Sequence, residues 1–124
     1  SSLQAWNGFR SKFEYLVAEN LVENGHCFDY EPKRIHYVSH HHYTPDFRVA
    51  GQNFYIECKG GSMSAEDRAK YQKASEQNED LDLRFLFYND RPIAKNSSTT
   101  FSMWAKRHGF QYSIGPEMPS QWMK

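Results

Sequence analysis

The chain has 124 residues, 39% of them hydrophobic and 16% aromatic, which is enough for the core of one domain over residues 1–124 and argues against a disordered protein. Fifteen basic residues balance fifteen acidic ones, so this is not a protein devoted to non-specific binding of phosphate. No apolar run reaches the roughly 18 residues that span a bilayer, the first residues do not resemble a signal peptide, and two cysteines make no disulfide framework, so we expect a cytoplasmic protein.

The first predicted element is a helix over residues 9–24, where apolar residues recur at helical spacing. Ser11 and Glu14 have the S-x-x-E spacing of a capping box. Gly25 follows the last periodic residue and suits a C-terminal cap.

Extended structure is predicted next. Residues 27–39 are rich in aromatic and β-branched side chains and should form two short pieces that break at Pro32. Residues 43–50 and 53–59 are expected to pair as a β-hairpin through the turn at residues 50–52.

The second half of the chain alternates between helices and strands. In order, we expect a helix over 65–78 capped by Ser64, a buried strand over 83–88, a helix that opens at Ser98 or Thr99 and ends before Gly109, a strand over 110–113 and a turn over 120–123. Together these elements predict the α/β class, with a mixed β-sheet flanked by helices.

Three carboxylates and a lysine are the candidates for chemistry. Glu57 and Lys59 are two residues apart on a predicted strand, so their side chains share one face. The hairpin can bring Asp46 beside Glu57, and Glu14 lies on the preceding helix.

This set suits phosphodiester hydrolysis. Clustered carboxylates bind Mg²⁺, with Mn²⁺ as a substitute, and two such ions can clamp the attacking and leaving oxygens. Lys59 would orient the water or stabilise the phosphoryl oxygens. Two carboxylates about 5 Å apart repel by roughly 3 kcal/mol at an effective dielectric of 20, so we expect a divalent cation to stabilise the folded chain.

Each residue also has a purely structural interpretation. Glu14 could serve only as the capping partner of Ser11. Pro45-Asp46 could simply start a turn, and Glu57 with Lys59 could be a surface pair worth about 0–1 kcal/mol. The order of these motifs on adjacent predicted strands favours the catalytic interpretation.

The motifs resemble a known family. Thr44-Pro45-Asp46-Phe47 followed by Ile56-Glu57-Cys58-Lys59-Gly60 is similar to the PD-(D/E)xK nuclease motif. A wider pattern resembles endonuclease I of the T-seven type phages, which resolves four-way (Holliday) junctions; it comprises Phe9 to Glu14, Tyr43 to Phe47, Asp67-Arg68, Leu81 to Arg84, Lys106 to Gly109, Ile114, Pro119 and Trp122.

The resemblance implies roles for individual residues. Glu14, Asp46, Glu57 and the backbone carbonyl of Cys58 would bind two metal ions, and Lys59 would be catalytic. It also implies a restriction-endonuclease-like fold, an intertwined homodimer that exchanges its first helix through a bridge over residues 33–42, and cleavage that leaves a 5′-phosphate and a 3′-hydroxyl. A phage-encoded chain would act in the host cytoplasm.

Basic side chains are candidate contacts to the phosphates of branched DNA; they are Arg10, Lys12, Lys33, Arg34, Lys70, Lys73, Arg91, Lys95, Lys106 and Arg107. Lys70 and Lys73 could equally be a solvated helix face. His40, His41 and His42 raise the possibility of zinc, but consecutive residues of an extended chain point in alternate directions and converge poorly, so we expect a phosphate contact or a solvated loop there.

Two other functions remain open at this point. One is another PD-(D/E)xK nuclease, a nickase or restriction-type enzyme that acts on duplex DNA. The other is a non-catalytic DNA-binding module with a vestigial site. Cleavage of a four-way junction compared with a linear duplex separates the first from a resolvase, and the effect of replacing Lys59 separates the second.

Overall fold

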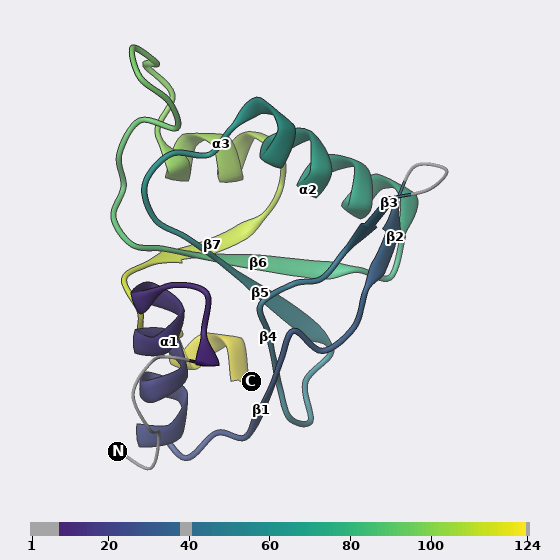
Figure 1. Cartoon of the computed structure of the whole chain (residues 1–124), viewed down its shortest axis with the longest axis vertical. Coiled ribbons are helices and arrows are strands. Elements are labelled where there is room, and N and C mark those ends of the chain that lie inside the picture. The colour runs from purple at the N-terminus through teal and green to yellow at the C-terminus, as the bar shows by residue number, and fades with distance from the viewer. Residues whose placement is uncertain (1–7, 38–40, 124) are drawn as a thin grey trace.

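A computed structural model of the chain describes residues 8–37 and 41–123 and has three layers around a mixed sheet (Figure 1). The sheet has the strand order β1-β4-β5-β6-β7, and its strands are β1 (Phe28–Tyr30), β4 (Phe47–Val49), β5 (Phe54–Lys59), β6 (Asp82–Phe87) and β7 (Gln111–Ile114). β1, β4 and β5 pair antiparallel, whereas β5, β6 and β7 pair parallel. The predicted α/β class with a mixed sheet is therefore confirmed.

Helices cover both faces of this sheet. Figure 1 shows α2 (Ala65–Gln77) and α3 (Phe101–Arg107) on one side, and α1 (Lys12–Glu23) with the C-terminal 3-10 turn (Ser120–Met123) on the other. Each side has its own buried cluster, because alternate strand residues point to opposite faces. The sheet therefore separates two apolar cores, and a site at its edge can take side chains from both layers.

A second, two-stranded sheet holds β2 (Ile35–Tyr37) and β3 (His41–Tyr43) in antiparallel register. Its strands come from the segment predicted as a bridge, residues 33–42, together with Tyr43, and β2 lies against α2. The exchange of the first helix through this segment stays a prediction. Residues 38–40, including His40, lie outside the described residues.

The first helix is shorter than the predicted 9–24. It begins at Lys12, because Ser11 has an extended backbone and its side chain accepts a hydrogen bond from the N–H of Glu14 (3.1 Å). It ends before Gly25, which has a left-handed backbone (φ +76°) and donates to the carbonyl of Val22, as a C-terminal glycine should.

Two other boundaries were predicted wrongly. The strand expected over 43–50 is split: Tyr43 ends β3 in the small sheet and β4 begins only at Phe47, since Pro45 between them has no N–H for a ladder. Thr100, rather than Ser98 or Thr99, caps α3. The carbonyl of Thr99 accepts a hydrogen bond from Ile93 (2.9 Å), which keeps that residue in extended structure.

In the part of the chain that the structure describes, the helices are all too short or too polar to cross a bilayer.

Candidate active site

β5 carries the first two site residues. Glu57 and Lys59 face the α2 layer, and Glu57 is buried although it is an acid. Cys58 lies between them and packs into the cluster on the α1 side of the sheet. The predicted alternation is confirmed, and the Cys58 side chain is a packing group.

Asp46 lies next to Glu57 because of the hairpin register. Phe47 pairs with Ile56 across β4 and β5, so the residue before Phe47 falls opposite the residue after Ile56. One oxygen of the buried Asp46 carboxylate, Oδ2, accepts a hydrogen bond from the N–H of Cys58 (2.8 Å). Pro45, which precedes Asp46, does start an irregular segment, but the Asp46 side chain points into the site.

Glu14 reaches the same place from the opposite layer. It lies in the first turn of α1, and its Oε1 accepts hydrogen bonds from the N–H of Arg10 (3.0 Å) and the hydroxyl of Tyr30 (2.5 Å). Its backbone N–H serves the cap at Ser11, whereas its carboxylate is free of that cap and faces the site. Glu14 therefore takes part in the cap through its backbone, while its carboxylate lies at the site, and its functional role stays a prediction.

Burial singles out these acids. Within the described residues, Glu14, Asp46 and Glu57 are the charged side chains classed as buried, with 6–8% of their surface exposed. Together with Lys59 they line one cavity of about 350 Å³, whose rim also includes Arg10 and Lys70. A buried charge is costly unless it is paired, so a cluster of this kind needs a chemical explanation.

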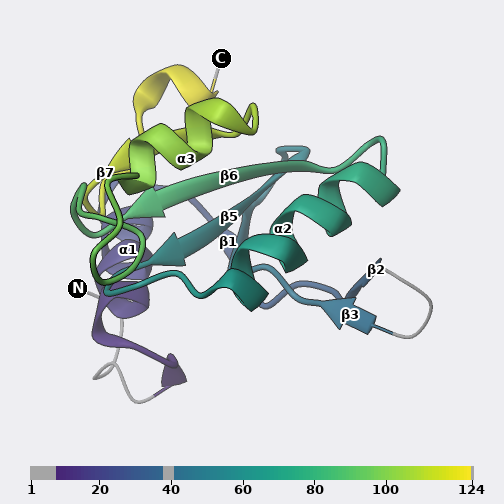
Figure 2. The same cartoon turned by 90° about the horizontal axis from the view of Figure 1, so that it is seen from above.

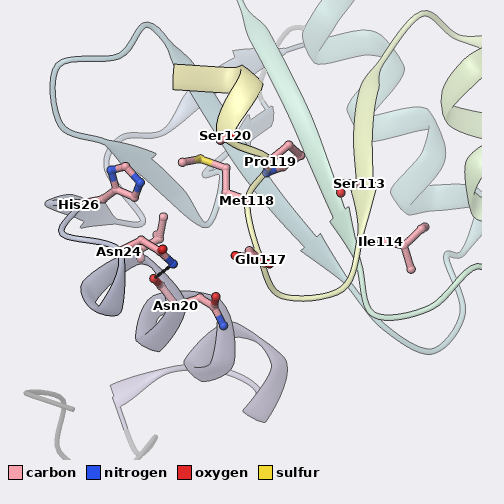
Figure 3. Close-up of a pocket in the computed structure, with 10 residues that line it drawn as sticks. Asn20, Asn24, His26, Ser113, Ile114, Glu117, Met118, Pro119 and Ser120 are labelled. Carbon is pink, nitrogen blue, oxygen red and sulfur yellow. Dashed lines mark hydrogen bonds between the residues drawn. The ribbon is translucent and has the colours of Figure 1, made fainter. Parts of the chain in front are cut away.

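A larger cavity of about 430 Å³ lies between the end of α1 and the C-terminal segment (Figure 3). Asn20, Asn24 and His26 line one side of it, and Glu117 is the only carboxylate that the described residues place in its wall. Among residues 8–37 and 41–123, no lysine or arginine lines this cavity, so these residues do not give it the convergent charges of the smaller one.

Two carboxylates of the candidate site, those of Asp46 and Glu57, resist ionisation. Burial, reinforced by the charges of Glu57 and Glu14, raises the pKa of Asp46 to about 9. Burial likewise raises the pKa of Glu57 to about 7, against the opposing effects of the hydroxyl of Tyr43 and the charge of Lys70. Such shifts are typical of functional sites, where acids are held together without enough positive charge.

The donor set suits a hard divalent cation, because it consists of carboxylate oxygens. Among the residues that the structure describes, no three histidine, cysteine or acidic side chains are already spaced as a metal-coordination sphere. Glu57 instead directs its two oxygens to the hydroxyls of Tyr43 (2.5 Å) and Tyr71 (3.0 Å). Each of these oxygens keeps a further lone pair for a cation.

Sequence reasoning missed the residues that surround the acids. Tyr43 and Tyr71 hold Glu57, and Asp67 forms an ion pair with Lys59 (2.9 Å). Burial raises the pKa of Asp67, but the contacts with Lys59 and Lys70 together lower it by more. The pKa of Asp67 therefore lies below its ordinary value. A tyrosine one helical turn after an aspartate was the only sequence signal for this arrangement.

The predicted phosphate contacts are distributed unevenly. Arg10 and Lys70 line the candidate site, where Arg10 pairs with Glu31 (2.6 Å). Lys70 is not on a solvated face, since its ammonium lies over the rings of Tyr43 (5.3 Å) and Tyr71 (5.1 Å). The remaining candidates do not line the site cavity, and all of them are exposed; they are Lys12, Lys33, Arg34, Lys73, Arg91, Lys95, Lys106 and Arg107.

Comparison with known proteins gives a consistent result. The whole chain, residues 1–124, matches the family described as phage endonuclease I. It is 38% identical over 109 residues to endodeoxyribonuclease 1 of Enterobacteria phage T3, covering 85% of this chain and 70% of that protein. It is 33% identical over 120 residues to endonuclease I of Escherichia phage T7, covering 94% of this chain and 78% of that protein.

Proposed function

This chain belongs to the phage endonuclease I family, and we propose that it is a metal-dependent endonuclease of the PD-(D/E)xK type that resolves four-way junctions and other branched DNA. The family itself makes the chain a DNA endonuclease, which is a hydrolase. Metal dependence and selectivity for branched DNA are the parts that we propose.

One observation carries the proposal. The buried acids Glu14, Asp46 and Glu57 line one cavity with Lys59, although they come from α1, the start of β4 and β5. A fold gains no stability from gathering like charges in a buried place, so their convergence is best explained by a substrate or cofactor of opposite charge.

The metal would be held by the carboxylates of Glu14, Asp46 and Glu57 and by the backbone carbonyl of Cys58. When bound, a divalent ion would neutralise charge on the phosphoryl oxygens and lower the pKa of a water molecule. Burial of the acids keeps bulk water from competing for the same oxygens.

Lys59 would donate a hydrogen bond to a phosphoryl oxygen or to the attacking water. Its ammonium lies at the cavity, and the ion pair with Asp67 fixes its position there. Hydrolysis adds hydroxide to phosphorus, breaks the bond to the 3′ oxygen and transfers a proton to that oxygen, which leaves a 5′-phosphate and a 3′-hydroxyl.

We also propose that the active enzyme is a homodimer in which the first helix is exchanged through residues 33–42. In the single chain described, Glu14 lies in the cavity of its own chain. Exchange through this segment would carry β1 along with α1, so Glu14 would keep its hydrogen bonds to Arg10 and Tyr30 and would line the cavity of the partner chain instead. Two such sites would cut opposing strands of a junction.

The test is cleavage of a labelled four-way junction and of a linear duplex with the same arm sequence, with and without Mg²⁺. We expect cleavage only with the metal and much faster cleavage of the junction. Equal rates on both substrates would refute junction selectivity, and cleavage in the presence of a strong chelator would refute metal dependence.

A further inference from the structure

The first half of α2 presents three polar side chains to the candidate site. Asp67, Lys70 and Tyr71 are three and four residues apart, so they share one face of the helix. Lys59 donates to Asp67 (2.9 Å), and Tyr71 donates to Glu57 (3.0 Å). Two residues of one helix thus hold the two functional side chains of β5.

The spacing of the two elements explains this match. Four residues of an α-helix rise about 6 Å, and two residues of a strand rise about 6.6 Å. Asp67 meets Lys59 and Tyr71 meets Glu57, so α2 runs antiparallel to β5, along its length (Figure 2). One rigid helix can therefore support both groups at once.

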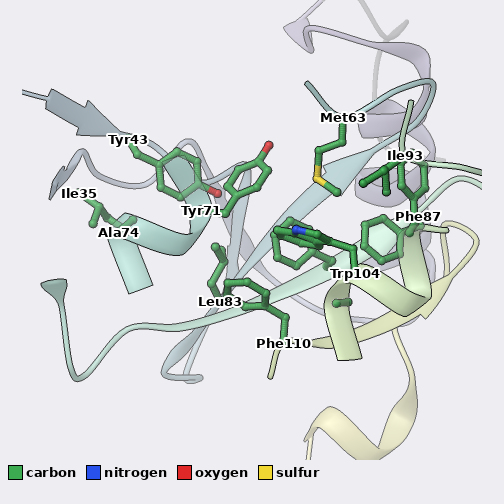
Figure 4. Packing of buried hydrophobic residues seen from close by; sticks show 13 residues of the cluster. Ile35, Tyr43, Met63, Tyr71, Ala74, Leu83, Phe87, Ile93, Trp104 and Phe110 are labelled. Carbon is green, nitrogen blue, oxygen red and sulfur yellow. The ribbon is translucent and has the colours of Figure 1, made fainter. Parts of the chain in front are cut away.

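Tyr71 is a firmly fixed donor. Only 1% of its surface is exposed, and its ring makes edge contacts with Phe85 (5.0 Å between centroids), Trp104 (6.2 Å) and Tyr43 (5.5 Å). Figure 4 shows Tyr43 and Tyr71 side by side at one end of the buried cluster. Because neither ring can turn freely, their hydroxyls determine the orientation of the Glu57 carboxylate.

Asp67 is fixed in a similar way. Its backbone N–H donates to the side chain of Ser64, which caps α2, and its second oxygen lies 3.5 Å from the ammonium of Lys70. Lys70 in turn lies over both tyrosine rings. The ion pair that holds Lys59 is therefore anchored to the helix rather than to a mobile loop.

We propose that α2 is the positioning element of the active site: Tyr71, together with Tyr43, holds the carboxylate of Glu57 ready to bind a divalent cation, and Asp67 holds the ammonium of Lys59 at the scissile phosphate. This inference rests on the proposed nuclease function. A carboxylate that is already oriented loses less freedom when it binds a cation, so the outer hydrogen bonds add to metal affinity.

The first test is Tyr71→Phe, which removes one hydroxyl and keeps the ring. The readout is Mn²⁺ binding to the protein without DNA, measured by titration calorimetry. We expect about tenfold weaker binding, the lower end of what the loss of an outer-shell partner costs. Tyr112→Phe is the matched control, since Tyr112 packs against the same cluster and its hydroxyl is not at the site.

Binding by Tyr71→Phe within twofold of the wild type would overturn the role of Tyr71. If this variant does not fold, Tyr43→Phe serves in its place, because Tyr43 reaches the other oxygen of Glu57 from β3. The same tenfold loss is expected for it, and no loss would again refute the inference.

The second test is Asp67→Asn, read as the separate effects on kcat and KM for junction cleavage. We expect kcat to fall about tenfold or more and KM to change less than threefold, because Lys59 loses its orientation while the DNA contacts remain. Glu66→Gln is the control, since it removes a neighbouring acid from the same first turn of α2. Equal kcat values for the two variants would refute the role of Asp67.

These outcomes are distinguishable from failure of the proposed function. A wild-type chain that neither binds Mn²⁺ nor cleaves DNA with it would refute both. A wild-type chain that does both, with variants indistinguishable from their controls, would refute only the positioning role of α2.

Discussion

Asp46→Asn offers a direct measure of how strongly the carboxylates interact. Asparagine keeps an oxygen that can accept the hydrogen bond from the N–H of Cys58, so the backbone contact at this point survives. What is removed is an acid whose ionised form would lie beside the negative charges of Glu57 and Glu14. The variant should lose DNA cleavage but gain stability when no metal is present.

The gain can be estimated. Two unit charges about 5 Å apart repel by about 3 kcal/mol at an effective dielectric of 20. Relief of most of this repulsion gives a gain of about 2–3 kcal/mol, or about 10 °C in Tm for a domain of this size. Burial adds to the gain, because the amide has no charge to desolvate.

The pH dependence provides the check. The pKa of Asp46 is raised to about 9 in the folded chain from an ordinary 3.8, so the folded state favours the protonated acid. Its destabilising effect is absent below pH 3.8, grows as the pH rises and is complete above pH 9. The advantage of Asp46→Asn should therefore be below about 1 kcal/mol at pH 4 and close to its full size at pH 8.5.

Thermal unfolding at these two pH values, with a chelator present, measures the effect. Asp82→Asn is the control, since Asp82 lies on β6 and pairs with Arg84 (2.8 Å), so its replacement should give no gain at either pH. An advantage of Asp46→Asn that is the same at both pH values, or a loss of stability near pH 8.5, would show that the acids do not interact as described.

Four further outcomes are expected. Lys59→Ala should lower junction cleavage at least about 100-fold and leave metal-free junction binding, measured by gel shift, within about threefold. If the first helix is exchanged, a mixture of Glu14→Gln and Lys59→Ala chains should regain cleavage through mixed dimers, whereas sites completed within one chain would stay inactive. Gly25→Ala should lower stability by about 1 kcal/mol, seen in thermal unfolding, because its φ of +76° strains any side chain although no atom lies near enough to clash. Mg²⁺ at about 100 times its Kd should stabilise the wild type by about 2.7 kcal/mol, and a melting curve that does not move would contradict convergence of the acids.

The parts of the site that depend on local rules could be predicted from the sequence. Alternation along a strand places Glu57 and Lys59 on one face, and hairpin register brings Asp46 opposite Glu57. Both rules act over a few residues, so no knowledge of the remaining fold was needed. The resemblance to a nuclease family supplied Glu14, whose helical position alone was equally consistent with a capping role.

The supporting residues could not be predicted, because they depend on how α2 lies over the sheet. A polar pair at positions 67 and 71 occurs on many solvated helices, and only the packing of α2 against β5 turns it toward Glu57 and Lys59. Tyr43 was placed in the wrong strand, so its contact with Glu57 was also missed. The N-cap of α3 is Thr100, later than predicted, because the carbonyl of Thr99 is held by a hydrogen bond of the preceding loop. The sequence pattern does not reveal that hydrogen bond.

Acidic residues gather at the edge of the sheet where β5 ends, because two helices begin there. The first turns of α1 and α2, which carry Glu14 and Asp67, both lie at this edge, and a helix N-terminus favours negative charge by about 0.3–1 kcal/mol. Repulsion between neighbouring acids is about 3 kcal/mol for a pair, so the helix dipoles offset only part of it. The remainder stays in the metal-free fold as a net cost. The negative charges that help to raise the pKa of Asp46 also attract a cation, but the cation must displace the proton of this carboxyl, so metal binding should strengthen as the pH rises.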